Sequence, residues 1–354
     1  MKVTVDMNTA MDRLNCTEKD YLKYALGGLM YTPAHNSSAA DMIISRKYKG
    51  LHSMVFCLED AIADSSEGKA LEQLTETFSQ LGAATLSGEL NTVSMPFLFV
   101  RVKYPEQIRI VYDLIGKYGL LKGFIFPKFD TSNAQQYINY LLEINKQSAD
   151  RIYGMPILES AMVSDIETRT QELAALRHIT DSVKEYILNI RIGGNDFCSQ
   201  FGLRRSVSNT IYDIKVVADL ISDIVNVFSR DYVVSAPVWE YFEGQDATDT
   251  SWSQGLRREA ELDLLNGLTG KTVIHPTQLQ IINSVLEVSA EDYNDAISIL
   301  DWKDELLGVA KGAAGNRMNE QKVHKNWAVK ILIRAMIYGI KNTDIERKPE
   351  VCLK

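Results

Sequence analysis

Two acidic residues stand at the ends of apolar stretches and could together hold a divalent metal ion. Glu159 directly follows the stretch 155–158, and Asp196 follows an Ile- and Leu-rich stretch that closes with two glycines. Two glycines let the backbone turn sharply or approach a ligand closely. Because Mg²⁺ prefers oxygen ligands and binds through one or two carboxylates plus the substrate, the pair predicts a Mg²⁺ site. The alternative is that both acids cap helices or pair with Arg101.

Two basic residues also follow apolar stretches, and each suits a different chemistry. The planar guanidinium of Arg101 fits a carboxylate or a developing enolate oxygen. Lys128 could instead form a Schiff base with a carbonyl substrate, as in metal-free aldolases. The alternatives are structural: an ion pair of Arg101 with Glu59 or Asp60, and a salt bridge between Lys128 and a neighbouring carboxylate. The two roles of Arg101 are compatible, because an ion pair can orient its guanidinium.

Three further residues are candidates for contact with a substrate. His275 precedes a proline at the end of another apolar stretch, where it could be a general acid or base, or a purely structural residue. Gly194 and Asn195 adjoin Asp196 and could approach a bound ligand. The neighbouring segment 267–272 superficially resembles a phosphate-binding loop, but its glycine spacing is too short and a strand rather than a helix follows.

Short apolar stretches precede most of these residues and predict buried parallel strands. Continuous rather than alternating apolar runs suit a parallel sheet that is covered on both faces. Eight such strands spaced by helices, the clearest helix over 207–228, predict an α/β fold, the closed (β/α)8 TIM barrel, whose active sites gather at the carboxyl ends of its strands. An open doubly wound sheet is the alternative, but it usually has fewer strands. The predicted strands span 28–33, 54–58, 97–100, 123–126, 155–158, 186–192, 232–236 and 272–274.

The chain changes character after residue 277. The helices predicted there span 278–288, 292–309 and 322–340, with a flexible stretch over 312–320. We expect a lead-in over 1–25, a catalytic barrel over 26–288 and a carboxyl-terminal helical extension or lid over 289–354. The last helix carries too much apolar surface to face water, so it packs on its own barrel or on a neighbouring copy. The second arrangement predicts a homo-oligomer.

Composition and charge argue against several classes of protein. The chain of 354 residues carries a net charge of −8 at pH 7, which repels phosphate backbones and argues against nucleic acid as a partner. Its four cysteines form no Cys-x-x-Cys pair and indicate reduced thiols in a cytoplasmic protein. No apolar run approaches the roughly 20 residues of a membrane helix, and the amino terminus lacks the apolar core of a signal peptide.

Six short motifs follow one another along the chain. They are Leu58-Glu59-Asp60-Ala61, Val100-Arg101-Val102, Pro127-Lys128, Ile157-Leu158-Glu159-Ser160, Gly193-Gly194-Asn195-Asp196-Phe197, and Gly270-Lys271 with Ile274-His275-Pro276-Thr277-Gln278. Each motif alone is weak, but six in this order are specific. Together they resemble the HpcH/HpaI aldolase and citrate lyase β-subunit family, in a divergent branch of C–C bond lyases. The resemblance covers roughly residues 26–340.

The resemblance implies a TIM barrel that binds Mg²⁺ and cleaves or forms a carbon–carbon bond next to a 2-oxo acid. The substrate would be a small 2-oxo acid or 3-hydroxy acid, with CoA as a candidate partner. On the matching positions, Glu159 and Asp196 would hold the metal. Arg101 would bind the oxo acid and steady the enolate, and Glu59 and Asp60 would orient Arg101 or a metal-bound water.

Two segments depart from the family pattern. Related citrate lyases carry Pro-Gly and then an arginine after the first strand, whereas this chain has Pro33-Ala34-His35-Asn36-Ser37, without that basic contact to CoA. Related CoA lyases carry a lid motif that begins with an acidic residue. In this chain the corresponding stretch, 315–320, begins with glycine, so Glu320 is its remaining carboxylate. Two alternatives therefore stay open: a Schiff-base aldolase that uses Lys128, and a non-catalytic protein that binds a metal and an oxo acid.

Overall fold

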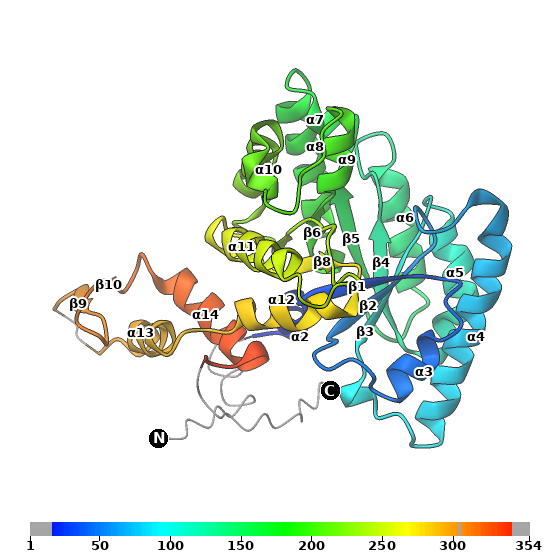
Figure 1. Ribbon diagram of the computed structural model, residues 1–354, viewed down its shortest axis with the longest axis horizontal. Coiled ribbons are helices and arrows are strands. Elements are labelled where there is room, and N and C mark those ends of the chain that lie inside the picture. Colours follow the sequence, from blue (N-terminus) through cyan, green and yellow to red (C-terminus); the bar gives the residue numbers. More distant parts are fainter. Residues whose placement is uncertain (1–15, 304–305, 342–354) are drawn as a thin grey trace. The chain divides into compact units, whose positions relative to one another are not determined.

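Eight parallel strands form a closed ring in the computed structural model, which describes residues 16–303 and 306–341 (Figure 1). The strands are β1 (Gly28–Pro33), β2 (Ser53–Cys57), β3 (Phe97–Arg101), β4 (Leu121–Phe126), β5 (Tyr153–Leu158), β6 (Ile190–Ile192), β7 (Val234–Ser235) and β8 (Lys271–Val273). Each strand pairs with the next in chain order, and β1 pairs with β8. A bridge between Ala236 and Lys271 joins the ends of the sheet. The predicted TIM barrel is confirmed, and the open doubly wound sheet is wrong.

Burial explains why these apolar stretches form strands. Every residue of β2 and of β5 is buried, as expected for parallel strands that are covered on both faces. The sixth strand is shorter than predicted. Tyr186 lies in a short 3₁₀ helix, Lys184–Tyr186, and the chain first meets β5 through the bridge between Ile187 and Gly154. The glycine-rich turn therefore follows a strand of only three residues.

Helices follow the strands and surround the ring (Figure 1). They are α3 (Ala39–Ile44), α4 (Glu67–Leu86), α5 (Gln107–Ile115), α6 (Ala134–Asn145), α7 (Ala161–Ser164), α8 (Arg169–Ser182), α9 (Gly194–Gln200), α10 (Lys215–Phe228), α11 (Ser251–Leu265) and α12 (Leu279–Leu286). The helix predicted to begin at 207 begins at Lys215. A capping box between Thr210 and Asp213 instead closes a separate 3₁₀ turn, with the Thr210 N–H donating to Asp213 Oδ2 at 2.7 Å.

The segment that superficially resembles a phosphate loop has a structural role. Lys271 is 2% exposed and lies at the start of β8. Its Nζ contacts Glu259 Oε1 at 2.9 Å and Asp263 Oδ2 at 2.8 Å, both on α11. A buried ammonium needs such partners because its desolvation is costly. The lysine therefore joins β8 to the helix that precedes it.

The described residues of Met1–Ala25 and Asn283–Lys354 form a second compact unit, apart from the barrel unit Leu26–Ile282. Its elements are α2 (Glu18–Ala25), the end of α12, α13 (Ala290–Leu300), β9 (Val309–Lys311), β10 (Met318–Glu320) and α14 (Lys325–Tyr338). Within this unit the apolar faces of α13 and α14 form one buried cluster. The domain boundaries expected from the sequence stay a prediction.

The stretch 312–320, expected to be flexible, is part of an ordered hairpin. β9 pairs antiparallel with β10, and the side chain of Asp295 on α13 holds the turn between them. Arg317 Nε lies 2.5 Å from Asp295 Oδ2, and the Ala313 N–H donates to Asp295 Oδ1 at 2.6 Å. The helix predicted over 292–309 ends at Leu300. The predicted bounds of this helix were wrong. The stretch 312–320, predicted without regular structure, forms a hairpin whose turn is held by the buried carboxylate of Asp295.

Among the described residues, no helix combines the length and apolar character needed to cross a membrane. Cys16, Cys57 and Cys198 are free thiols. The fourth cysteine of the sequence, Cys352, lies outside the described residues.

Candidate active site

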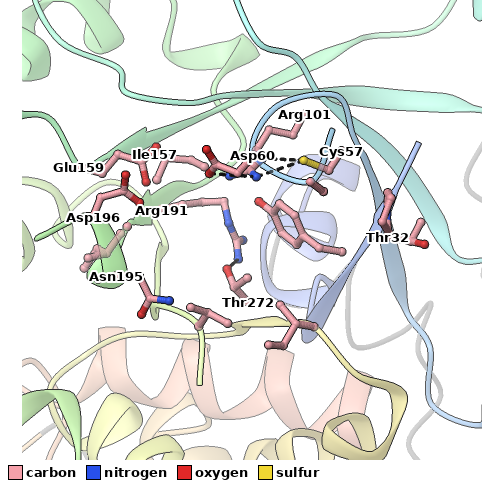
Figure 2. A pocket seen from close by; sticks show the side chains of 18 residues that line it. Thr32, Cys57, Asp60, Arg101, Ile157, Glu159, Arg191, Asn195, Asp196 and Thr272 are labelled. Carbon is pink, nitrogen blue, oxygen red and sulfur yellow. Dashed lines mark hydrogen bonds and ion pairs between the residues drawn. The ribbon is translucent and has the colours of Figure 1, made fainter. Parts of the chain in front are cut away.

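A cavity of about 400 Å³ opens at the carboxyl ends of the barrel strands (Figure 2). Six of the residues singled out in the sequence line it: Asp60, Arg101, Glu159, Gly194, Asn195 and Asp196. Three others, Glu59, Lys128 and His275, do not line it directly. Parallel strands bring these positions together because their carboxyl ends meet at one rim of the barrel.

Two carboxylates face the same side of the cavity. Glu159 follows β5 and is 4% exposed, and Asp196 lies in the first turn of α9. Figure 2 shows the two side chains next to each other. Burial, together with the charge of Asp196, raises the pKa of Glu159 to about 8. The pair therefore forms a site in which a cation would relieve both desolvation and repulsion, as expected of two metal ligands.

The backbone around Glu159 is arranged to hold its carboxylate. The Lys128 N–H donates to Glu159 Oε1 at 2.9 Å, and to do so Lys128 adopts a φ of 49°, in the left-handed region that non-glycine residues avoid. A Cβ on Gly193 would lie only 1.9 Å from Glu159 Oε2. Gln200 Nε2 donates to the Glu159 carbonyl at 2.9 Å. The glycine of the turn is thus required by the neighbouring carboxylate.

Arg101 is held on several sides while it lines the cavity. Its Nη1 lies 3.1 Å from Glu59 Oε2, and its Nη2 lies 3.3 Å from Asp60 Oδ2. Its Nε and Nη2 also donate to Cys57 Sγ at 3.2 and 3.1 Å, and its guanidinium lies 5.3 Å from the centre of the Tyr31 ring. The ion pairs anticipated for Arg101 are present, and they fix the plane of the guanidinium.

Lys128 is engaged by acidic neighbours. Its Nζ lies 2.5 Å from Glu59 Oε1 and 3.6 Å from Asp60 Oδ1. Burial opposes the charge of the ammonium, but the hydrogen bond and ion pairs prevail and raise the pKa of Lys128. A Schiff-base lysine must lose its proton to act as a nucleophile, so these contacts disfavour that role.

His275 has a local structural environment. It caps the 3₁₀ helix Pro276–Gln278, and its Nδ1 lies 2.8 Å from Thr277 Oγ1. Its ring stacks on Phe242 with centroids 4.6 Å apart. These contacts correspond to the structural alternative considered for this residue.

Several cavity residues went unrecognised in the sequence, among them Tyr31, Cys57 and Arg191. Tyr31 and Cys57 sit inside apolar strands, where nothing in their type marks them. Arg191 did carry a signal, because a charged residue between Ile190 and Ile192 interrupts a strand that is otherwise apolar. A buried charge is rare unless it is paired or functional.

The tight packing of Gly193 on Glu159 leads to a prediction for Gly193→Ala. The added methyl group displaces the Glu159 carboxylate, so Mg²⁺ affinity measured by calorimetry should fall at least about tenfold, as when a ligand loses its orientation. Gly244→Ala is the matched control, because a Cβ at that position meets nothing within 4 Å. Equal Mg²⁺ affinity in the two variants would contradict the assignment of Glu159.

The raised pKa of Glu159 leads to a prediction for pH dependence. A proton competes with a cation for the carboxylate below a pKa of about 8. Mg²⁺ affinity should therefore rise about tenfold per pH unit between roughly pH 6 and 7 and level off above pH 8, because binding releases one proton. Calorimetry in buffers of different ionisation enthalpy measures that proton. The dependence should flatten in Glu159→Gln; an identical slope in that variant would assign the proton elsewhere.

Comparison with known proteins gives a consistent picture. Citrate lyase subunit beta from Leuconostoc mesenteroides subsp. cremoris is 21% identical over 301 residues, which cover 84% of this chain and 88% of the relative. Among solved structures, CitE from Mycobacterium tuberculosis, in complex with magnesium, acetoacetate and coenzyme A, aligns with a TM-score of 0.57 and 18% identity over 88% of this chain and 99% of its own.

A second solved structure, the lead(II) complex of malate synthase from Haloferax volcanii, aligns with a TM-score of 0.54 and 15% identity over 73% of this chain and 72% of its own. Likeness at these identities shows a shared fold. The family model described as C–C bond lyase of the TIM-barrel fold matches residues 20–340, and the family expected from the six motifs is confirmed. The chain therefore belongs to the C–C bond lyases of the TIM-barrel fold.

Proposed function

We propose that the protein is a Mg²⁺-dependent lyase or synthase that cleaves or forms the carbon–carbon bond between a 2-oxo acid and an acyl group. The single observation that carries the proposal is the buried Glu159 beside Asp196, with Arg101 lining the same cavity. Its family consists of C–C bond lyases. The magnesium and acetoacetate named for the similar CitE structure fit the same donor set.

The residues present fit a magnesium ion. Two carboxylates are as many as Mg²⁺ usually takes from a protein, because it keeps waters and substrate oxygens in its other positions. Glu159 and Asp196 would hold it; within the described residues no group of three or more acidic, histidine or cysteine side chains offers a fuller set. When bound, the metal supplies Lewis-acid polarisation of the ketone oxygen.

Arg101 is the side chain that binds the substrate and stabilises charge during the reaction. Its guanidinium binds the carboxylate of the oxo acid and stabilises the negative charge that develops on the enolate oxygen. Glu59 and Asp60 hold the guanidinium in one plane, at 3.1 and 3.3 Å, and act as positioning residues. Lys128 holds Glu59 in turn. Because these contacts exist before substrate arrives, little reorganisation is needed during the reaction.

The substrate is a small acid, free or linked to CoA. Gly194 and Asn195 line the cavity beside Asp196 and are placed to contact it. The substrate-binding role considered for His275 receives no support from its contacts with Thr277 and Phe242. The loop after β1 contains no arginine or lysine, so a CoA partner would need other contacts.

Two alternatives make different predictions. A Schiff-base aldolase would use Lys128, whose ion pair with Glu59 keeps it protonated. A non-catalytic relative would bind Mg²⁺ and an oxo acid without turnover. Neither is favoured by an observation as specific as the buried carboxylate pair.

Turnover of a panel of 3-hydroxy acids, free and CoA-linked, tests the function. Activity with at least one member should require Mg²⁺, stop with EDTA, and fall by about 100-fold or more in kcat/KM in Asp196→Asn. Asp249→Asn is the control, since that aspartate is fully exposed. Tight Mg²⁺ and oxo-acid binding without turnover would identify the non-catalytic relative. A borohydride-trapped adduct on Lys128 would identify the Schiff-base aldolase.

We also propose that the protein is cytoplasmic and forms homo-oligomers. The described cysteines are free, as in a reducing compartment. Cell fractionation tests this localisation.

The second unit exposes apolar side chains on its hairpin, with Val309 at 48% and Met318 at 57% exposure. Such a surface is typical of a contact between subunits. Light scattering at micromolar concentration should give a mass above that of one chain, and a monomer would exclude the oligomer. The lid role of Glu320 stays a prediction.

A further inference from the structure

Arg191 is a charged side chain in the interior of the barrel. It is 1% exposed and lies on β6, one residue before that strand ends. A guanidinium that leaves water loses several kcal/mol of hydration, which partners of opposite charge normally repay. An arginine at such a position therefore requires a physical explanation.

The partners of Arg191 within the chain are neutral. Its Nη2 donates to Thr272 Oγ1 at 2.7 Å, and Tyr31 is its other polar neighbour. Burial raises the pKa of Tyr31, so its hydroxyl stays uncharged at neutral pH. The Nε and Nη1 of Arg191 have no hydrogen-bond partner among the described residues.

Other buried basic side chains in the described part of the chain have acidic partners. Lys271 contacts Glu259 and Asp263 at 2.9 and 2.8 Å. Arg205 lies 3.3 Å from Glu259 and 3.6 Å from Glu240. The fold thus supplies carboxylates where a buried cation serves stability. Among the described residues no carboxylate lies within ion-pair distance of Arg191, and its partners are the hydroxyl groups of Thr272 and Tyr31.

The position of Arg191 places this unneutralised charge in the active-site cavity. Ile157 of β5 is its neighbour in the sheet, two residues before Glu159, so Arg191 lies deeper in the barrel than the carboxylate pair. Figure 2 shows its side chain running toward Thr272, and Arg101 lines the same cavity. An anion bound by Arg191 would lie in the same cavity as a ligand bound by the residues at the rim.

We propose that Arg191 binds a second carboxylate of the substrate, so that this enzyme selects oxo acids with two anionic groups. The inference rests on the proposed function, in which the carboxylates at the rim and Arg101 engage the 2-oxo acid end. The guanidinium of Arg191 then pairs with the distal carboxylate, and Thr272 holds it through Nη2. Arg191 is a specificity-determining residue, and no bond forms or breaks at it.

Calorimetry with Mg²⁺ present tests the selection with ligands matched in chain length. Oxaloacetate is compared with 2-oxobutanoate, and 2-oxoglutarate with 2-oxopentanoate. The native protein should bind at least one dianion about tenfold or more tightly than its matched monoanion, as expected for hydrogen bonds to a charged group. Arg191→Met should lose this preference and keep its affinity for the monoanion. Methionine fills similar space and leaves no carboxylate unpaired, so the variant should fold.

The matched control is Arg109→Met, which removes the same charge from an exposed position on α5. This variant should keep the native preference. Equal binding of dianion and monoanion by the native protein, or an unchanged preference in Arg191→Met, would overturn the inference.

A second readout separates this inference from the proposed function. If the native protein binds no 2-oxo acid with Mg²⁺, the proposed function fails. The anion site at Arg191 is then tested separately, by measuring thermal unfolding with malonate and without metal. A rise in Tm in the native protein and Arg109→Met, but not in Arg191→Met, would support an anion site at Arg191. No rise, or the same rise in all three, would overturn it.

Discussion

The burial of Glu159 beside Asp196 is the interaction on which the rest of the site depends. A carboxylate at 4% exposure has lost most of its hydration, and a second acid at its side adds repulsion, so its pKa rises to about 8. The backbone around Glu159 is also constrained. Lys128 takes a left-handed conformation to donate its N–H, and position 193 has no space for a side chain. Strained backbone conformations of this kind cluster at active sites.

The charges in and around the cavity fall into a satisfied group and an open group. Arg101, Glu59, Asp60 and Lys128 form a connected set of ion pairs. That set is internally balanced, which keeps Arg101 oriented without a ligand. The open charges are the carboxylates at the rim and the guanidinium of Arg191 below them. A cation bound at the rim would neutralise the carboxylates, and an anion bound deeper in the barrel would neutralise Arg191. Metal and substrate would therefore each supply a counter-charge that the protein lacks.

Ion pairs away from the cavity perform a separate task. Lys271, Glu259, Asp263 and Arg205 form a buried network around β8 and α11. Each cation there faces a carboxylate, so the network joins elements of the barrel and leaves no buried cation without a counter-charge. The contrast between this closed network and Arg191 is the reason for proposing that Arg191 binds a ligand and does not serve the fold alone.

The fold class, the family and several residues at the rim of the cavity could be predicted from the sequence. Glu159, Asp196 and Arg101 were recognisable because each follows an apolar strand, and parallel strands of a barrel place all their carboxyl ends at one rim. The tertiary structure alone decided what lies inside. Which strand residues point inward, as Arg191 does, and whether a charged side chain finds a partner depend on neighbours distant in the sequence. The same holds for Lys128, whose contact with Glu59 joins residues 69 positions apart. The ordered turn around Asp295 was likewise invisible, because its order comes from a contact between Asp295 and Arg317 and not from local composition.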